Sequence, residues 1–391
     1  MLAPATTKPA TTKEDELHWL ALRLVPGLGT IKANQLIAQF RSPQAIFRAS
    51  RSELESRGLS GSVAQTIASG CTFDNAVDQQ QKMLETGTVL VPISDATYPA
   101  RLREIFDPPI VLFAHGRLEL LQSILLGVVG TRRPTAYGTA AAERLASDLA
   151  HAGLAIVSGM ARGIDTSAHR AALDVGGETI AVFGCGVDLV YPAENRKLAS
   201  ELAEKGLIVS EFPMGSPAYP QNFPIRNRII SGVGVGVLVV EGAQYSGSAI
   251  TAKMALDQQR EVFAVPGNIT SKMSWGPNLL IKQGAKLVQE WNDVLVELPT
   301  DTRRALIGKA QARLGVMSLE INEEQPNLPP ELGLASRLIF SKLKADVPTQ
   351  IDQLLESSDT LTSSEVIAAL FELELLGLAR QLPGKNFVKV W

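Results

Sequence analysis

Residues 126–134 read Leu126-Gly127-Val128-Val129-Gly130-Thr131-Arg132-Arg133-Pro134. A short apolar run, with no polar residue alternating in it, is followed at once by a glycine, a hydroxyl and two cations. Such a run is typical of a parallel strand that is buried on both faces. The stretch therefore predicts one strand-loop-helix unit of a Rossmann-like α/β domain, with a basic loop at the carboxyl end of its strand.

Similar runs recur along the chain and alternate with helical patterns, including those at Ala140–His151 and Ala249–Gln259. This alternation predicts a parallel sheet covered by helices, and we assign residues 85–298 to one Rossmann-like domain. The predicted strands are Thr88–Ser94, Val111–Ala114, Leu126–Val129, Ala155–Ser158, Thr179–Phe183, Leu207–Glu211, Gly236–Glu241 and Glu261–Val265.

Smaller regions flank this domain. Residues 1–15 contain no apolar run and predict a disordered tail, and residues 299–334, rich in proline and charge, predict a linker with one short helix. Residues 16–84 predict an N-terminal helical (SAM-like) domain with a helix-hairpin-helix-like motif at 24–29; its glycine turn suits either a DNA phosphate or an ordinary αα-hairpin. A β-hairpin after helical patterns at Ala335–Leu343, Thr349–Ser357 and Ser363–Leu376 predicts a C-terminal winged-helix domain at 335–391.

Composition narrows the functional classes. Of the 391 residues 45% are hydrophobic and 20% charged, which is enough for a sizeable core, and a net charge of −3 makes any polyanion site a local patch. Cys71, Cys185 and four scattered histidines offer neither a disulfide scaffold nor metal-ligand spacing. We do not expect the N-terminal tail to be a signal peptide, and no apolar run in the sequence is long enough to span a membrane. We expect a reduced, soluble, cytoplasmic protein without metal, cofactor or membrane contact.

The position of the arginines is the most informative feature. Residues 120–230 contain ten Lys/Arg and ten Asp/Glu, and the acids lie mainly on predicted helices. Five arginines instead follow predicted strands or begin helices: Arg132, Arg133, Arg162, Arg226 and Arg228. Ligands of open α/β sheets bind outside the carboxyl ends of the strands, so these arginines are expected to converge in one crevice.

Glycines and hydroxyls surround these arginines where helices are expected to begin. Their exposed N–H groups, together with arginine forks, suit several phosphates and hence a polynucleotide backbone. Aromatic residues of the same loops suit stacking of unpaired bases: Tyr137, Tyr219, Phe223 and Tyr245. Alternatively, the glycines merely form tight turns, the arginines cap helices, and Phe223 and Tyr137 are core residues. The predicted DNA-binding residues are Gly130, Thr131, Arg132, Arg133, Ser158, Gly159, Arg162, Gly163, Phe223, Arg226, Asn227, Arg228, Ser246, Gly247 and Ser248.

Signals for catalysis are weaker. The chain has no GxxxxGK(S/T) phosphate loop, and the glycines at 232–236 precede their strand, so they cannot open a helix onto a pyrophosphate. Asp165 and His169 could pair across one helical turn, and Glu241 could act as a base in the crevice. Alternatively, Asp165 caps helix 166–174 and His169 packs beneath it. Because no nucleophile accompanies these groups, we predict no catalytic residue.

Taken in order, these motifs resemble the DNA-processing protein A family (DprA/Smf). The similarity covers about residues 98–290 and departs from the family's GLS element at Gly232-Val233-Gly234. The upstream segment that carries it is Tyr98-Pro99 with Leu102, Asp107–Pro109, Leu112-Phe113 and Gly116. The others are Gly130–Thr135 with Tyr137-Gly138, Ser158–Asp165 with Ala168-His169, Tyr191-Pro192 with Asn195, Ser210–Pro213, Phe223–Gly232, Val240-Glu241, Ser246–Ser248 with Thr251-Ala252, and Val265–Gly267.

The resemblance implies cooperative binding of single-stranded DNA by a homodimer, protection of incoming strands and loading of the RecA recombinase during natural transformation, without known catalysis. Two alternatives use the same crevice: a nucleotide-processing enzyme, such as an N-glycosidase or phosphoribohydrolase, and a nucleotide sensor. The PGGxGTxxE element of phosphoribohydrolases is missing. Ser246-Gly247-Ser248 lies roughly where it would fall, without the following glutamate.

Overall fold

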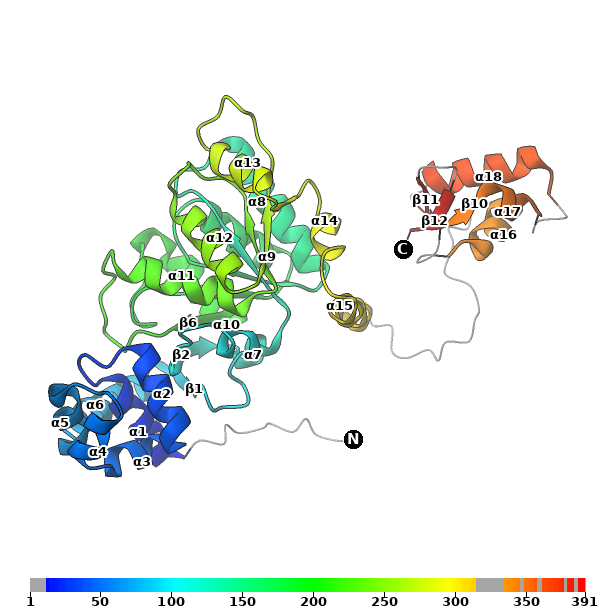
Figure 1. Cartoon of the computed structure of the whole chain (residues 1–391). Helices are drawn as coiled ribbons and strands as arrows, with labels where there is room; N and C mark the ends of the chain where they lie inside the picture. Colours follow the sequence, from blue (N-terminus) through cyan, green and yellow to red (C-terminus); the bar gives the residue numbers. More distant parts are fainter. Residues whose placement is uncertain are drawn as a thin grey trace. The chain divides into compact units, whose positions relative to one another are not determined.

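The structure, a computed structural model, describes residues 12–313, 333–344, 348–356, 361–375, 378–382 and 386–390. The chain divides into two compact units, residues 1–315 and 316–391. In the first unit a group of short helices precedes an α/β domain (Figure 1). These helices are α1 (Lys13–Arg23), α2 (Thr30–Phe40), α3 (Pro43–Arg48), α4 (Arg51–Ser56), α5 (Gly61–Ser69) and α6 (Phe73–Thr86).

Three of the N-terminal helices begin at a hydroxyl that accepts a hydrogen bond from the first turn: Thr12 for α1, Ser42 for α3 and Ser50 for α4. A capping box between Thr12 and Asp15 starts α1, and the hairpin between α1 and α2 turns at Gly27, whose φ of 79° favours glycine. Trp19, on α1, belongs to a core that continues into the α/β domain at Phe113. The helical domain and one end of the sheet therefore share a core.

The α/β domain is built on a nine-stranded sheet of order β1-β2-β6-β5-β4-β3-β7-β8-β9. The strands from β6 to β9 in this order are parallel, whereas β2 runs antiparallel to both of its neighbours. The direction of winding reverses between β3 and β7, which makes that position the topological switch point. The strands are β1 (Val89–Pro92), β2 (Val111–Gly116), β3 (Leu125–Val129), β4 (Ala155–Ser158), β5 (Thr179–Val182), β6 (Leu207–Ser210), β7 (Gly236–Val239), β8 (Glu261–Ala264) and β9 (Lys286–Leu287).

Helices cover both faces of this sheet. α8 (Ala136–His151) and α9 (Ile164–Asp174) pack on the face that contains Val128, and α11 (Asn222–Val233) and α12 (Gly247–Asp257) pack on the face that contains Val129. Alternate residues of a strand point to opposite faces, so the buried strands are apolar on both. The remaining helices of the first unit are α7 (Ala100–Arg103), α10 (Arg196–Lys205), α13 (Trp275–Lys282), α14 (Trp291–Leu295) and α15 (Thr300–Arg313).

The second unit is a winged helix with its own core. Its elements are α16 (Leu334–Lys342), β10 (Thr349–Gln350), α17 (Ile351–Glu356), α18 (Ser363–Leu375), β11 (Ala379–Leu382) and β12 (Asn386–Lys389). The three strands form a sheet of order β10-β12-β11. Ile339, Val366, Leu373 and Phe387 are buried together.

The Rossmann-like core, the N-terminal helices and the winged helix expected from the sequence are confirmed, and the eight predicted strands are placed within two residues. Three details differ. Residues 13–15 of the expected tail belong to α1, and residues 1–11 lie outside the described residues. The short helix expected within the linker is α15, which is 14 residues long and buries Leu306 in the α/β core; residues 314–332 lie outside the described residues. Thr349 and Gln350, expected to be helical, form β10.

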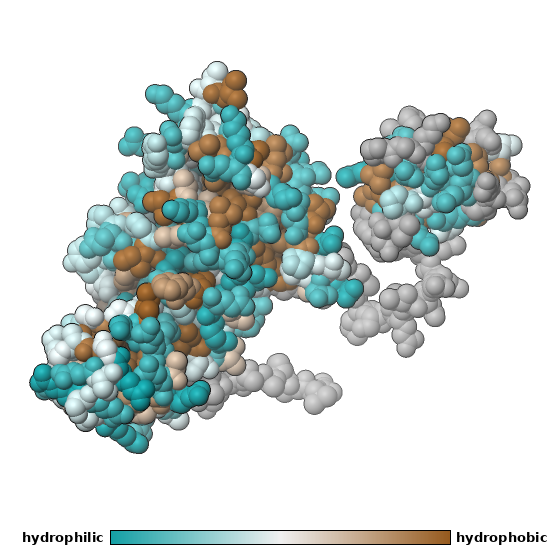
Figure 2. All heavy atoms as spheres, in the orientation of Figure 1, coloured by the Kyte–Doolittle hydropathy of each residue, from teal (hydrophilic) through white to brown (hydrophobic). Residues whose placement is uncertain are grey.

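Polar side chains dominate the viewed surface of the N-terminal helices, and apolar patches lie over the α/β domain (Figure 2). In the part of the chain that the structure describes, no helix combines the length and apolar character needed to cross a membrane.

Candidate nucleic-acid interface

A pocket lies at the carboxyl ends of β3, β4 and β5. Arg132 comes from the loop after β3, Arg162 from the loop after β4, and Arg226 from the first turns of α11. The complete lining is Arg132, Gly159, Ala161, Arg162, Tyr191, Pro192, Phe223 and Arg226. Three of the five arginines expected to converge therefore do so.

Phe223 is the aromatic centre of this pocket. The guanidinium carbons of Arg132 and Arg226 lie 5.3 and 5.9 Å from its ring centroid, within cation–π range. The ring of Tyr191 lies 5.5 Å from that of Phe223 at an interplanar angle of 32°. Because the Tyr191 residue is 45% exposed, the pocket offers an accessible aromatic surface beside the three arginines.

Arg226 is the buried cation of the site, with 3% of the residue exposed. Its Nη1 donates to the Gly159 carbonyl over 2.6 Å and to the Val182 carbonyl, at the ends of β4 and β5. Burial, aided by the nearby charge of Arg132, lowers the pKa of Arg226 to about 10, although Asp165 opposes the shift. The side chain remains charged at neutral pH. A Cβ at position 159 would lie 2.5 Å from Nη1, so this close approach requires a glycine.

The loop after β4 is fixed from below by Asp165, which accepts hydrogen bonds from the backbone N–H groups of Gly159 (3.1 Å) and Ala161 (3.3 Å). Burial raises the pKa of Asp165, and the charge of Arg226 opposes that rise. The alternative that Asp165 caps a helix at 166–174 is wrong: α9 begins at Ile164 after Gly163, so Asp165 lies inside its first turn. His169 bonds to Thr179 Oγ1 over 2.7 Å. These residues support the loop.

Glu241 fixes the loop after β3. Its carboxylate accepts from the backbone N–H of Thr135 over 2.9 Å and from the hydroxyl of that residue over 2.6 Å. Thr135 is the N-cap of α8, the first helix after the switch-point strand β3. In dinucleotide-binding folds the pyrophosphate lies at that helix N-terminus. In this chain the Glu241 carboxylate occupies the N-terminus of α8 instead.

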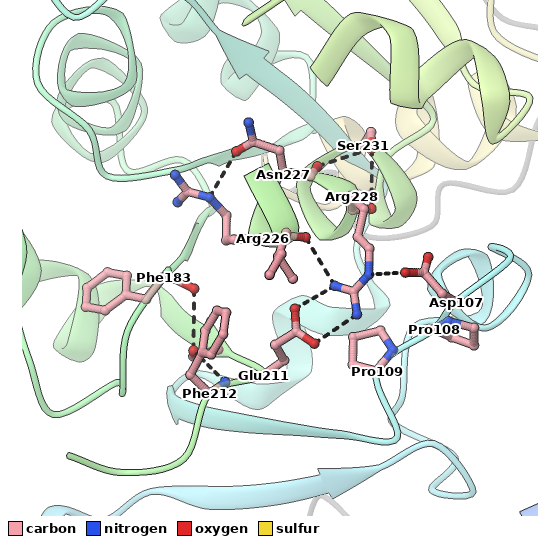
Figure 3. A network of polar contacts seen from close by, with 12 residues as sticks. Asp107, Pro108, Pro109, Phe183, Glu211, Phe212, Arg226, Asn227, Arg228 and Ser231 are labelled. Carbon is pink, nitrogen blue, oxygen red and sulfur yellow. Dashed lines mark hydrogen bonds and ion pairs between the residues drawn. The ribbon is translucent and has the colours of Figure 1, made fainter. Parts of the chain in front are cut away.

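Arg228 does not line the pocket, contrary to the expected convergence, and Figure 3 shows it bound to Glu211 and Asp107 instead. Its Nη1 and Nη2 donate to the two carboxylate oxygens of Glu211 over 2.6 and 2.8 Å, and its Nε donates to Asp107 over 2.9 Å. Burial by itself would lower the pKa of Arg228, but the carboxylates of Glu211 and Asp107 together raise that pKa above its ordinary value. Residues two positions apart on a helix point about 200° apart, so Arg226 and Arg228 face opposite ways.

The other predicted residues fall into three groups. Arg133 and Thr131 belong to the accessible loop after β3, and Asn227 accepts a hydrogen bond from Arg226 Nε over 3.1 Å. Three others support the backbone of the pocket loops. The Ser158 hydroxyl donates to the Val128 carbonyl, Gly130 packs against Ile164, and Gly163 has a φ of 77°. Ser246, Gly247 and Ser248 follow β7, across the switch point, where Ser246 caps α12; they do not line the pocket.

Aromatic residues were predicted less well than cations. Tyr137 donates its hydroxyl to the Pro266 carbonyl, and Tyr219 and Tyr245 are exposed outside the pocket. Tyr191 also lines the pocket but is not among the aromatic residues predicted to stack on bases. Its only signal was the Tyr191-Pro192…Asn195 element of the resemblance.

Together these features define an α/β protein with a cationic, aromatic pocket at the ends of a parallel sheet, joined to a winged-helix domain. Residues 89–299 match the family model for DNA recombination-mediator protein A, and residues 323–385 match the DprA winged helix domain. The chain belongs to the DNA-processing protein A (DprA/Smf) family.

Individual relatives are similar over most of the chain. DNA processing protein DprA of Bacillus subtilis is 40% identical over 67% of this chain and 93% of its own length. Protein Smf of Synechocystis is 34% identical over 95% of this chain and 98% of its own length. The crystal structure of DprA from Streptococcus pneumoniae is 34% identical, covers 74% of this chain and 99% of that chain, and has a TM-score of 0.60. A second structure, which describes the single-stranded DNA binding mode of DNA processing protein A from Helicobacter pylori, is 29% identical. It covers 56% of this chain and 96% of that chain, with a TM-score of 0.49.

Proposed function

We propose that this chain binds single-stranded DNA in the pocket at the ends of β3, β4 and β5 and performs no chemistry on it. The observation that carries the proposal is the set of three guanidinium groups around Phe223 and Tyr191. Cations that engage phosphates and rings that stack on any base are the features that bind single strands without sequence preference.

The proposed contacts divide by distance from the pocket. Arg132, Arg162 and Phe223 would meet the strand directly, with Thr131, Arg133 and Asn227 beside them. Arg226 is only 3% exposed, so it would add positive charge to the pocket from its buried position. Gly130, Ser158, Gly159 and Gly163 would hold the backbone close to it. Ser246–Ser248 would be reached only by a strand that continues past the switch point. Arg228 would act by holding α11, because its donors are bound to carboxylates.

The position of Glu241 argues against the nucleotide-processing and nucleotide-sensing alternatives. A nucleotide phosphate at the switch point would meet a carboxylate that already occupies the N-terminus of α8. The negative phosphate and the negative carboxylate would repel each other strongly in this buried environment. The proposed function places the strand on the other side of β3, where the arginines lie.

The wider role follows the family resemblance. We propose that the chain acts in the cytoplasm as a homodimer, protects incoming single strands and passes them to the RecA recombinase during natural transformation. Light scattering coupled to gel filtration tests the dimer. Nucleation of RecA filaments on strands coated with single-strand-binding protein tests the transfer, and filament formation at the unassisted rate would contradict it.

Replacement of Arg132 by alanine tests the pocket. Arg132→Ala should weaken binding of a fluorescent oligo-dT, and the slope of log affinity against log salt should fall by about 0.7, since one phosphate contact on a single strand is lost. Fluorescence anisotropy over a salt series measures both quantities.

Arg304→Ala is the matched control, because it removes the same charge from an exposed position on α15. It should leave affinity and slope almost unchanged. Unchanged binding by folded Arg132→Ala protein would remove the pocket from the proposal. Release of free base or of orthophosphate from nucleoside monophosphates would favour an enzyme.

A further inference from the structure

An ion pair lies across the rim of the pocket. Arg162 Nη2 lies 2.5 Å from Glu194 Oε1, and the two side chains are 59% and 60% exposed. Arg162 lines the pocket, whereas Glu194 belongs to the short turn that follows Tyr191 and Pro192. One of the three cations offered to a DNA strand is therefore already paired with an anion.

The backbone on both sides of this pair is firmly held. The buried amide of Asn195, next to Glu194, donates to the Met160 carbonyl over 2.8 Å and to Thr166 Oγ1 over 2.9 Å. The Thr166 hydroxyl in turn donates to the Ala161 carbonyl over 2.7 Å. Many surface ion pairs are worth little because two mobile side chains must be ordered to form them. Here the two turns are tied together directly beside the charges, so the carboxylate stays within reach of the arginine.

We propose that Glu194 competes with DNA phosphate for Arg162 and thereby limits the affinity of the pocket for single strands. This inference rests on the proposed function of the pocket. A phosphate that approaches Arg162 must displace the carboxylate, and the displaced carboxylate then lies beside the strand and repels it. Arg196 and Lys197, which follow directly, are exposed cations, so Glu194 is the anion in an otherwise basic stretch of this rim.

Neutralising Glu194 should therefore strengthen binding. Glu194→Gln keeps the size of the side chain and removes its charge, and it should raise the affinity for oligo-dT roughly three- to fivefold at low salt. The slope of log affinity against log salt should steepen by about 0.7, since Arg162 becomes free to neutralise one more phosphate. Glu194→Ala should give the same direction of change.

Two controls isolate the competition. Glu55→Gln removes one charge from a similar exposed pair with Arg51, 2.7 Å apart in the N-terminal helices, and should change affinity little. In an Arg162→Ala background, Glu194→Gln should give a clearly smaller gain, because the two residues act on each other. An equal gain from Glu55→Gln, or an undiminished gain without Arg162, would show a general charge effect and overturn the proposal. Unchanged or reduced affinity of Glu194→Gln would overturn it as well.

The same titrations separate this inference from the function on which it rests. If wild-type protein fails to bind oligo-dT, the proposed function fails. If wild-type protein binds and Arg132→Ala weakens binding, but Glu194→Gln does not strengthen it, only the competition fails.

Discussion

His169 shows how one buried side chain can tie stability to pH. The residue is fully buried under the pocket. The Thr179 hydroxyl donates to the Ile156 carbonyl, so His169 Nδ1 must donate to Thr179 Oγ1, and Nε2 carries the lone pair. Nε2 has no hydrogen-bond partner among the described residues. Burial, together with the charge of Arg226, lowers the pKa of His169 from 6.5 to about 3.

This shift predicts a loss of stability in mild acid. The unfolded chain takes up a proton near pH 6.5 and the folded chain does not, so His169 contributes its full stabilisation above that pH and loses it as the pH falls. Between pH 7 and pH 5 the loss should be about 2 kcal/mol. Urea unfolding followed by tryptophan fluorescence should show this extra loss in the wild type but not in His169→Gln. Parallel pH dependence of the two proteins would refute the assignment.

Arg226 and Arg228 show how far residue-level prediction reached at the site. Both stand in one motif that was assigned to the crevice because arginines cluster after the predicted strands. In the structure they lie on α11, where a spacing of two sends one into the pocket and the other toward Glu211 and Asp107. The sequence carries the helical spacing, but the acidic partners come from distant segments. Only the fold brings them together.

At the scale of elements, strand positions were predictable and strand directions were not. Buried parallel strands are uninterrupted apolar runs, so β4 was placed at Ala155–Ser158 from its residues alone. β2 is equally apolar but antiparallel to its neighbours, and periodicity carries no information on direction. The short turn at Ala193–Asn195, which carries Glu194, was missed because a single turn has no periodic pattern.

The network around Arg228 should anchor α11 to the rest of the first unit. Glu211→Gln leaves the buried guanidinium without its main counter-charge and should lower the free energy of unfolding by about 3–5 kcal/mol. Asp107→Asn should cost only about 1 kcal/mol, because the Asp107 side chain is 37% exposed and that of Glu211 is 6% exposed. Urea titration of both variants measures the difference. Equal losses would show that Glu211 is not the principal partner.

At the scale of the whole molecule, the chain consists of two units with separate cores. The N-terminal helices share the core of the α/β domain, and Arg23 of α1 donates to the Glu211 carbonyl at the end of β6. The sequence predicted separate N-terminal and Rossmann-like domains from a change in pattern at about residue 85. It could not predict the shared core, because the residues that build it are distributed over both segments.

The winged helix should contribute little to the grip on single strands. A domain of this kind reads DNA with a basic helix in the groove, but α18 carries Glu365, Glu372 and Glu374 and no lysine or arginine. In the hairpin, the Lys389 ammonium lies 4.2 Å from the centroid of the Phe340 ring. This cation is therefore already engaged in a contact within the domain. Carboxylates laid against phosphates would be repelled.

Removal of residues 334–391 should therefore change the affinity for oligo-dT by less than tenfold, about 1.4 kcal/mol, and leave the salt slope unchanged. Exposed apolar side chains on this unit, such as Ile367 at 55%, are better suited to a protein partner than to a polyanion. Anisotropy titration compares the affinities and salt slopes of the shortened and full-length chains. Urea unfolding of the shortened chain checks that the first unit still folds. A loss of tenfold or more, with a flatter salt slope, would make the winged helix a DNA clamp, since only lost phosphate contacts reduce that slope.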